Sequence, residues 1–387
     1  MPMNIFYSYN DEKWYSDCPN TVLFGKNLLP IYEYKSQRGT LFSVKQQNQK
    51  VGPLIGILAS KEGRDDFYGN RSTFKRIQNY LQKHGGISFV MTPEGYQGEQ
   101  IAGYLFDQGE WKLAYFPLPD VIYNRVASYQ SELKLDKIKK MAFKNAIPFY
   151  NPHFFGKWET FKQLAENASL TKYLPKTKRL DHLEDLQNWL DDYQSIMVKP
   201  VLSNRGNGIL SITKRGKTYE VKANGWKQCF ENIADVWDAI YRDGFHQQFI
   251  IQKRIALRQL EERPYDFRIL VQRMRDRWMV TGIGVRLAGH GSITTHVPHG
   301  GKILPFELVS HGIDIKEIEI LASQVARQLE LAYGYLCEFS IDLGIDEDNT
   351  PWLFEVNSKP MKFDEPHIQE KALKTLIECF YDDTGFI

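Results

Sequence analysis

Two stretches near the end of the chain, 337–345 and 351–357, alternate apolar and polar residues. A period of two is typical of β-strands, whose successive side chains point to opposite faces of a sheet. An acidic turn, 346–350, separates the two stretches. The pattern therefore predicts a β-hairpin with one apolar face and one polar face.

The polar face of this hairpin carries candidate metal ligands. If Ile345 pairs with Trp352, Asp342 lies directly opposite Glu355, and Asn357 lies just beyond on the same face. Facing carboxylates repel each other unless a cation lies between them. Two carboxylates and an amide oxygen suit Mg²⁺ or Mn²⁺. The alternative is an acidic hairpin on the protein surface.

The hydrophobic pattern divides the rest of the chain into three regions. Residues 1–50 contain short apolar runs interrupted by glycine and proline, which predicts a small β-rich segment. Residues 51–150 alternate strand and helix patterns, which indicates an α/β domain with a parallel sheet. Residues 151–387 form a second α/β region, which we divide into subdomains of about 151–250 and 251–387.

Within the first α/β region, a strand at 121–123 ends in Asn124 and Arg125. Ligands of open α/β sheets bind outside the carboxyl ends of the strands. These two side chains are therefore either substrate contacts or members of a structural salt bridge in a loop.

A second candidate site follows the apolar strand 196–198. This strand ends at Lys199, and the loop after it contains Ser203, Gly206 and Gly208. Glycines let backbone N–H groups approach an anion, and a lysine supplies a positive charge for phosphate. The loop lacks the Gly-Lys-Ser/Thr sequence of a Walker A motif. It is either a phosphate-binding loop or an ordinary hairpin.

Two later stretches contain further polar residues. Asp266 and Arg268 share one face of a predicted strand. His296 and His299 lie in a glycine-containing loop without a third ligand at a suitable spacing, which favours loop histidines over a metal site.

Composition narrows the class of protein. The chain has 387 residues, with 49 Lys and Arg against 47 Asp and Glu, so no basic surface for nucleic acid or membrane is indicated. The four cysteines are scattered, which argues against a zinc site or a disulfide framework. The chain begins without an apolar leader pattern. We expect a soluble, cytoplasmic protein, as a monomer or an oligomer, that acts on a small molecule.

The order of these motifs resembles the ATP-grasp superfamily. The wording Glu-Val-Asn-Ser-Lys-Pro at 355–360 and Val-Gly-Pro-Leu-Ile-Gly-Ile-Leu at 51–58 looks like the YheC/YheD branch found in spore-forming bacilli. The resemblance extends from Val51 to the end of the chain. It implies an α/β (α+β) fold in which an N-terminal α/β domain precedes a two-subdomain ATP-grasp domain.

The resemblance also implies roles for individual residues. The residues that would bind ATP are Lys172, Lys199, Ser203, Gly206, Gly208, Gln252, Lys253 and Ile255, of which the last three form a hinge that contacts adenine. Asp342, Glu355 and Asn357 resemble the ligands of Mg²⁺ or Mn²⁺. Lys199, Arg268 and Arg286, with Gly300 and Gly301, match positions that act on the transferred phosphoryl group or the acceptor.

The function implied by the resemblance is ATP-dependent ligation. A carboxylate on a small molecule or peptide would be phosphorylated to an acylphosphate, which an amine or thiol would then attack, in a protein with a role in spore formation. Two alternatives stay open. One is a non-catalytic ATP-binding structural protein associated with the spore coat, and the other is a kinase-like phosphotransferase.

Overall fold

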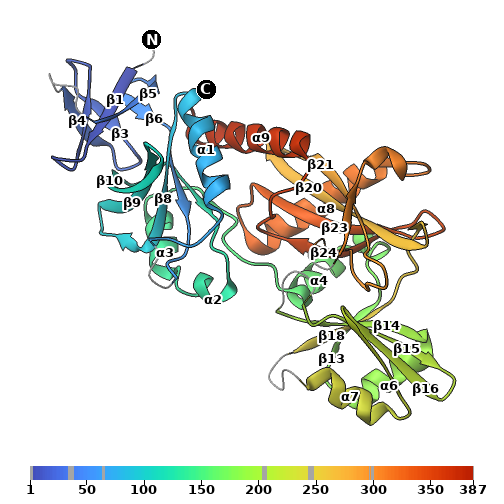
Figure 1. The fold of residues 1–387 in the computed structure, drawn as a ribbon. Helices are drawn as coiled ribbons and strands as arrows, with labels where there is room; N and C mark the ends of the chain where they lie inside the picture. The colour runs from blue at the N-terminus through green and yellow to red at the C-terminus, as the bar shows by residue number, and fades with distance from the viewer. Residues whose placement is uncertain are drawn as a thin grey trace.

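The computed structural model describes residues 3–33, 39–62, 66–202, 207–242, 248–295, 297 and 300–386. The chain contains both helices and sheets, so the predicted α/β class is confirmed. Within these ranges four sheets follow one another, and Figure 1 shows them from the blue N-terminal strands to the orange and red C-terminal part.

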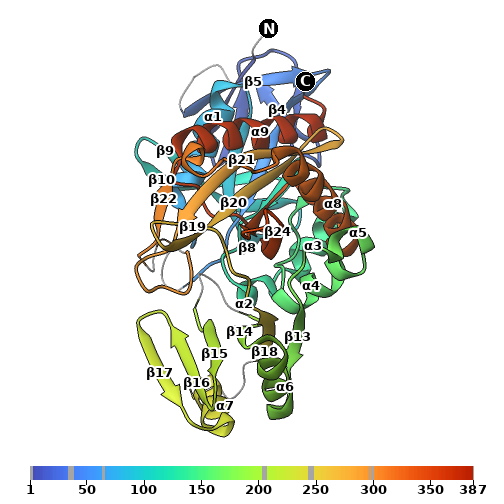
Figure 2. The same cartoon turned by 90° about the vertical axis from the view of Figure 1, so that its right-hand side faces the viewer.

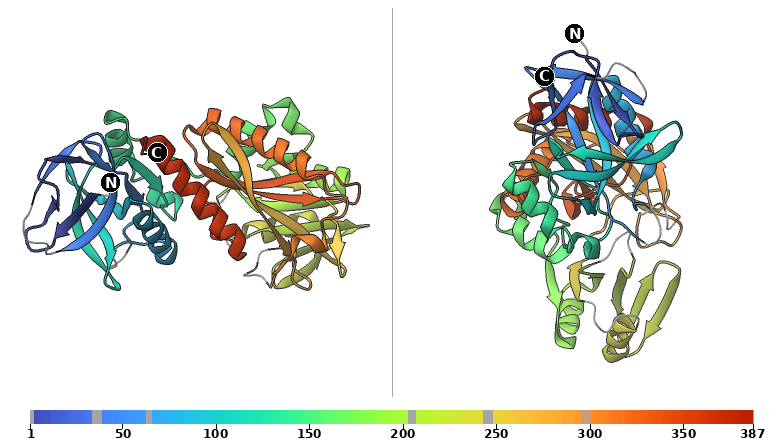
Figure 3. Two further views of the ribbon diagram at one scale, coloured as in Figure 1. Left: turned by 90° about the horizontal axis from the view of Figure 1, so that it is seen from above. Right: turned by 90° about the vertical axis from the view of Figure 1, so that its left-hand side faces the viewer.

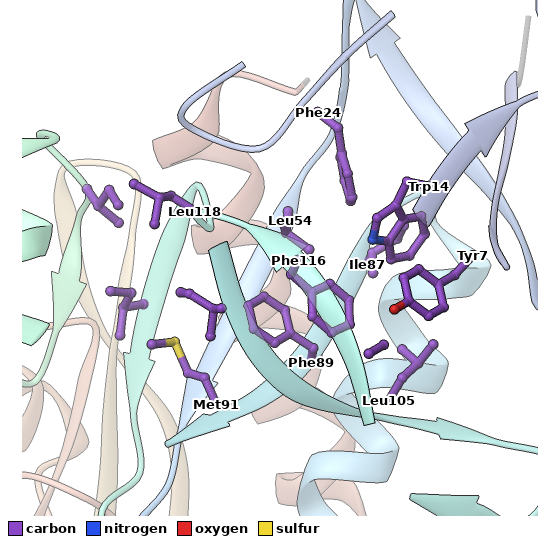
Figure 4. Close-up of a cluster of buried hydrophobic side chains, with 14 of the residues drawn as sticks. Tyr7, Trp14, Phe24, Leu54, Ile87, Phe89, Met91, Leu105, Phe116 and Leu118 are labelled. Carbon is purple, nitrogen blue, oxygen red and sulfur yellow. The ribbon is translucent and has the colours of Figure 1, made fainter. Parts of the chain in front are cut away.

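The first sheet is a closed barrel with the strand order β1-β2-β4-β3-β6-β5. Its strands are β1 (Met3–Ser8), β2 (Lys13–Ser16), β3 (Val22–Phe24), β4 (Leu29–Glu33), β5 (Thr40–Gln47) and β6 (Lys50–Gly52). The barrel shares its core with the next sheet, because Trp14 packs 5.6 Å from Phe116 between ring centroids. Figure 4 shows these rings beside the stacked pair Phe89 and Phe116. The predicted β-rich segment is thus anchored to the domain that follows.

The second sheet has the order β10-β9-β8-β7-β11-β12. Its strands are β7 (Leu54–Leu58), β8 (Ile87–Tyr96), β9 (Gln100–Asp107), β10 (Glu110–Pro117), β11 (Val121–Asn124) and β12 (Phe149–Tyr150), and its helices are α1 (Arg71–Lys83), α2 (Tyr129–Glu132) and α3 (Asp136–Lys144). Strands β8, β7, β11 and β12 pair in parallel, as predicted. Strands β9 and β10 extend this sheet as an antiparallel hairpin.

The third sheet, of order β13-β18-β14-β15-β16-β17, forms a separate lobe at the bottom of Figures 1 and 2. Its strands are β13 (Thr177–Leu180), β14 (Ser195–Pro200), β15 (Leu210–Arg215), β16 (Thr218–Ala223), β17 (Trp226–Phe230) and β18 (Phe249–Lys253). Helices α6 (Leu183–Tyr193) and α7 (Ile233–Tyr241) pack their apolar residues against it. This arrangement places Lys199 near the end of β14.

The fourth sheet has the order β22-β21-β20-β23-β24, with β19 paired to β20. Its strands are β19 (Gln259–Leu260), β20 (Arg263–Met274), β21 (Arg277–Leu287), β22 (Lys302–Leu304), β23 (Glu338–Ile345) and β24 (Pro351–Asn357). Helix α8 (Ile315–Tyr333) buries an apolar stripe on one face, beside α4 (Lys157–Ala165) and α5 (Ala168–Thr171). Polar side chains of β20, β23 and β24 lie on the opposite face.

Helix α9 (Pro366–Thr384) lies on that opposite face and returns to the N-terminal half of the chain. It packs against β20 and β21 and also against α1 and β11. Figure 3 (left) shows α9, in red, running between the blue-green N-terminal part and the orange C-terminal sheet. It covers only part of the face, and the charged residues described below lie beyond it.

The hairpin β23–β24 has the predicted pairing of Asp342 with Glu355 but a different register near its turn. Trp352 lies opposite Gly344 rather than Ile345, so the predicted Ile345–Trp352 pair is wrong. The register shifts between Asp342 and Leu343, where the β24 strand contains one extra residue, Phe354. This bulge restores the pairing of the carboxylates, because one extra residue moves every later side chain along by one position.

Gly344 leaves space for the ring of the extra residue, Phe354, because glycine has no side chain. A Cβ atom at this position would lie 2.4 Å from the Phe354 ring and 2.5 Å from the Leu257 side chain. We expect Gly344→Ala to lower the free energy of unfolding by about 1–3 kcal/mol, the usual cost of overpacking. Urea unfolding followed by circular dichroism measures this change. Glu347→Ala, in the exposed turn of the same hairpin, is the control, and equal stability of the two variants would contradict the account.

Candidate functional site

The strand register brings three charged residues side by side on the fourth sheet. Arg268 of β20 lies opposite Asp342 of β23, and Asp342 lies opposite Glu355 of β24. Asn357 is two residues beyond Glu355 and therefore on the same face. The three predicted oxygen ligands, Asp342, Glu355 and Asn357, thus lie on two adjacent strands, and Arg268 lies beside them.

Two cations neutralise the carboxylates. Arg286 of β21 donates to both oxygens of Asp266 at 2.8 Å and lies 3.2 Å from an oxygen of Asp342. Burial alone would lower the pKa of Arg286, but the two carboxylates outweigh it and raise the pKa. Lys157 Nζ, at the start of α4, lies 3.3 Å from an oxygen of Glu355. The charges of this cluster are therefore balanced by cations from two elements, β21 and α4.

Lys199 approaches the same cluster from the other lobe. Its Nζ donates to the Gln252 side-chain oxygen at 2.6 Å and lies 5.6 Å from the centroid of the Phe354 ring. Gln252 is buried, and its amide nitrogen donates to Thr177, which fixes its orientation. Burial lowers the pKa of Lys199 to about 8, although Glu355 acts in the opposite direction. The ammonium group is therefore mostly charged at pH 7 and neutral above about pH 8.

The predicted hinge follows Gln252 at the end of β18. The Lys253 N–H donates to the carbonyl of Lys176 at 2.9 Å, and the Lys253 side chain is exposed. Ile255 is half-buried in the segment that leads to the fourth sheet. Gln252 thus lies inside the site, while Lys253 and Ile255 lie on the connection between the lobes.

Arg268 is positioned by the loop after β24. Its guanidinium donates to the Met361 carbonyl at 2.9 Å and lies 4.6 Å from the Phe363 ring centroid. Burial lowers the pKa of Arg268, which the nearby Asp342 partly offsets. The group has a fixed position on the same face as Asp342.

Among the described residues, the side chain of Lys172 contacts Tyr173 rather than this cluster. It is exposed at the end of α5, with its Nζ 4.5 Å from the Tyr173 ring centroid, and Tyr173 in turn donates to Glu317 of α8. Ser203 and Gly206, which the resemblance assigns to ATP binding, lie outside the described part of the chain. Gly208 is described, with φ of +72°, in the turn before β15.

Lys157 is the residue that our sequence reasoning missed. The N–H of Lys157 also donates to the carbonyl of Val201, which brings the start of α4 to the end of β14. A lysine in the first turn of a helix is unfavourable, because the positive end of the helix dipole lies there. Such a local contradiction is a signal of a functional position, and it is visible in the sequence.

The N-terminal candidates have structural partners. Asn124 is buried; its amide donates to the carbonyl of Asn151, and its oxygen accepts from Val126. Arg125 lies 3.3 Å from Glu338 and donates to the Pro360 carbonyl at 2.8 Å. Arg125 therefore forms the salt bridge of the structural alternative, and the Asn124 side chain bonds to backbone groups. Arg125 also lines a cavity. Gly300 and Gly301 follow β21 in the loop to β22, and His296 and His299 lie outside the described residues.

The oxygen donors Asp342, Glu355 and Asn357 fit a hard divalent cation bound together with a further ligand. Among the described residues, no three His, Cys, Asp or Glu side chains converge as a protein-only metal site. Two carboxylates and an amide leave coordination positions for other oxygens, which is how Mg²⁺ is commonly held with substrate phosphates. Phosphate oxygens would also attract Lys157 and Lys199.

Comparison with known proteins agrees with this geometry. The family model described as YheC/D-like ATP-grasp matches residues 146–381. The chain belongs to this family. It is similar to endospore coat-associated protein YheD of Bacillus subtilis strain 168, with 27% identity over 88% of this chain and 80% of that protein. YheC of the same organism is 21% identical over 70% of this chain and 78% of that protein.

Solved structures share the fold of this YheC/D-like chain. D-alanyl-alanine synthetase A from Vibrio cholerae superposes with a TM-score of 0.54 and 15% identity, covering 86% of this chain and 98% of that structure. VanG D-Ala:D-Ser ligase from Enterococcus faecalis gives a TM-score of 0.52 and 13% identity, and the match covers 85% of this chain and 99% of that structure. At these identities the likeness establishes the ATP-grasp fold. Within the described residues, no helix is long and apolar enough to cross a membrane.

Proposed function

We propose that this protein is an ATP- and Mg²⁺-dependent ligase that joins a carboxylate to an amine through an acylphosphate. The observation that carries the proposal is the convergence of Lys157 and Lys199 on the paired carboxylates Asp342 and Glu355, from opposite lobes. The family and its ligase fold neighbours support it.

Each residue has a role in this proposal. Lys157 and Lys199 bind the phosphates of ATP, and the hinge after Gln252 contacts the adenine. Asp342, Glu355 and Asn357 would hold Mg²⁺, which neutralises phosphate charge when bound. Arg286 keeps Asp342 in position, as its contacts with Asp266 and Asp342 indicate.

Arg268 lies where the reacting phosphoryl group is expected, next to Asp342. The terminal phosphoryl group passes from ATP to the carboxylate, which gives ADP and an acylphosphate. The amine then attacks the acyl carbon, the C–N bond forms, phosphate leaves, and the amine loses a proton. Such a reaction depends on positioning and charge stabilisation, which this cluster of cations supplies.

A non-catalytic role in the spore coat is the second candidate function, favoured by the names of the relatives YheD and YheC. A scaffold alone does not require paired carboxylates with two lysines beside them. The ligase is therefore the better account of the site.

Trapping with hydroxylamine separates the candidates. The protein is incubated with ATP, Mg²⁺, hydroxylamine and pools of amino acids and short peptides, and both ADP and hydroxamate are measured. We expect ADP and hydroxamate together in at least one pool. ADP without hydroxamate would indicate hydrolysis or a kinase-like transfer, and ATP binding without either product would indicate the scaffold.

The pKa of Lys199 predicts how ATP affinity depends on pH. Because the ammonium loses its proton above about pH 8, the dissociation constant for ATP should rise about tenfold per pH unit beyond that value. Calorimetric titration at pH 7, 8 and 9 with saturating Mg²⁺ measures this. Lys199→Arg keeps its charge over this range and should remove the dependence. A dissociation constant that is equal at pH 7 and 9 would contradict the assignment.

A further inference from the structure

A cavity of about 90 Å³ lies between the N-terminal domain and the fourth sheet. Its walls come from α1, β11, β20, α9 and the loop Pro360–Phe363. One ordered water needs only about 10–15 Å³, so the cavity has room for a larger group. None of the roles proposed above uses it.

The inner wall of the cavity is apolar. Leu270 and Phe363 are buried there, and Ile77, Ala372 and Leu373 complete the surface. A surface of this kind favours an aliphatic or aromatic group, because a charged group would lose its hydration without a partner. The cavity is therefore suited to a medium-sized apolar side chain.

The cavity adjoins the candidate catalytic cluster. Leu270 and Arg268 lie on the same face of β20, two residues apart, which is roughly 7 Å along a strand. The two sites also share a wall, since Arg268 donates to the Met361 carbonyl and Arg125 donates to the Pro360 carbonyl. One amino-acid molecule can span this distance.

The rim of the cavity is positively charged. Arg76, Arg125 and Lys362 line it with a single carboxylate, Glu338. Glu338 already accepts hydrogen bonds from Tyr123, Arg125 and Gln272. Arg76 donates to the Gln369 side-chain oxygen at 2.5 Å, which directs its guanidinium to this rim. Within the described part of the chain neither Arg76 nor Lys362 forms a salt bridge, so their charges suit a ligand with a free carboxylate.

We propose that the cavity binds the amine substrate, and that this substrate is an apolar α-amino acid with a free carboxylate. Its side chain occupies the cavity, its carboxylate contacts Arg76, and its amine faces the acyl carbon near Arg268. The C–N bond forms there as the C–O bond to phosphate breaks, and the amine proton leaves to solvent. This inference rests on the proposed ligase function and names the class of its acceptor.

Calorimetric titration with leucine tests the proposal, using both enantiomers and comparing glycine and glutamate. Titrations with and without ADP and Mg²⁺ make the result independent of catalysis. We expect one leucine enantiomer to bind at least tenfold more tightly than glycine or glutamate. Equal or weaker binding of both enantiomers would overturn the proposal.

Variants locate the binding site. Ala372→Trp fills the cavity and should weaken leucine binding at least tenfold, whereas Lys371→Trp, on the exposed side of α9, should not change it. Arg76→Gln should weaken binding of leucine but not of leucinol, which has no carboxylate. Unchanged leucine affinity in Ala372→Trp would overturn the proposal. Failure of the ligase function itself would show differently, as absence of hydroxamate from every substrate pool in the trapping assay.

Discussion

Lys199→Ala should lower ATP-dependent ADP release by about 10²–10³-fold, the usual effect of removing one positioned charge from such a site. Lys199 is held by Gln252 at 2.6 Å and lies in a buried environment, so surrounding water cannot replace its charge. A coupled assay for ADP, with the substrate pool that gives the hydroxamate, measures this change. Activity within threefold of wild type would contradict the assignment.

Two further lysines make this experiment sharper. Lys157→Ala should cause a loss of the same order, because Lys157 contacts Glu355 within the cluster. Lys172→Ala is the matched comparison, since Lys172 is an exposed lysine on a neighbouring helix. The sequence resemblance assigns Lys172 to the phosphates, whereas the geometry favours Lys157. The variant with the larger loss identifies the lysine that binds ATP.

Glu355→Gln should also lower ADP release by about 10²–10³-fold and should raise the Mg²⁺ concentration that gives half of the maximal rate. The amide keeps the size of the side chain but removes the charge that faces Asp342. It also removes the carboxylate charge that lies 3.3 Å from Lys157 Nζ, in a nearly buried position where the Lys157 side chain is 9% exposed.

Glu347→Gln is the control for this variant, because Glu347 lies in the exposed turn of the same hairpin. It should match wild type in both ADP release and Mg²⁺ dependence. Circular dichroism and thermal unfolding of both variants exclude a loss of fold. A well-folded Glu355→Gln protein with the wild-type Mg²⁺ dependence would remove Glu355 from the metal site.

The carboxylate pair could be predicted from the sequence, but the reason for its register could not. The alternation of apolar residues indicates both strands and the face that carries Asp342 and Glu355. Near the turn, however, the strand pairing is shifted by one residue from the prediction, so that Trp352 lies opposite Gly344. The extra residue Phe354 cancels this shift before the strands reach Asp342 and Glu355. A bulge depends on local packing, here on the space above Gly344, and it leaves the strand pattern of the sequence unchanged.

Long-range contacts were the other limit of sequence reasoning. Short strands were predicted for residues 1–50, but closure of the barrel depends on the pairing of β1 with β5, which are distant in sequence. Its attachment to the second sheet depends on contacts such as that of Trp14 with Phe116. Likewise, Lys157 joins the site because α4 packs beside α8 and the fourth sheet, far along the chain from its own position. The types of element follow from local periodicity, whereas the set of residues that meet in the site follows from tertiary packing.

The most direct test of the central claim is calorimetric titration of a non-hydrolysable ATP analogue into wild-type protein, with and without Mg²⁺. The account predicts one site per chain, with binding at least tenfold tighter in the presence of Mg²⁺, since Asp342 and Glu355 would otherwise repel the phosphates. No binding, or equal affinity with and without Mg²⁺, would contradict it.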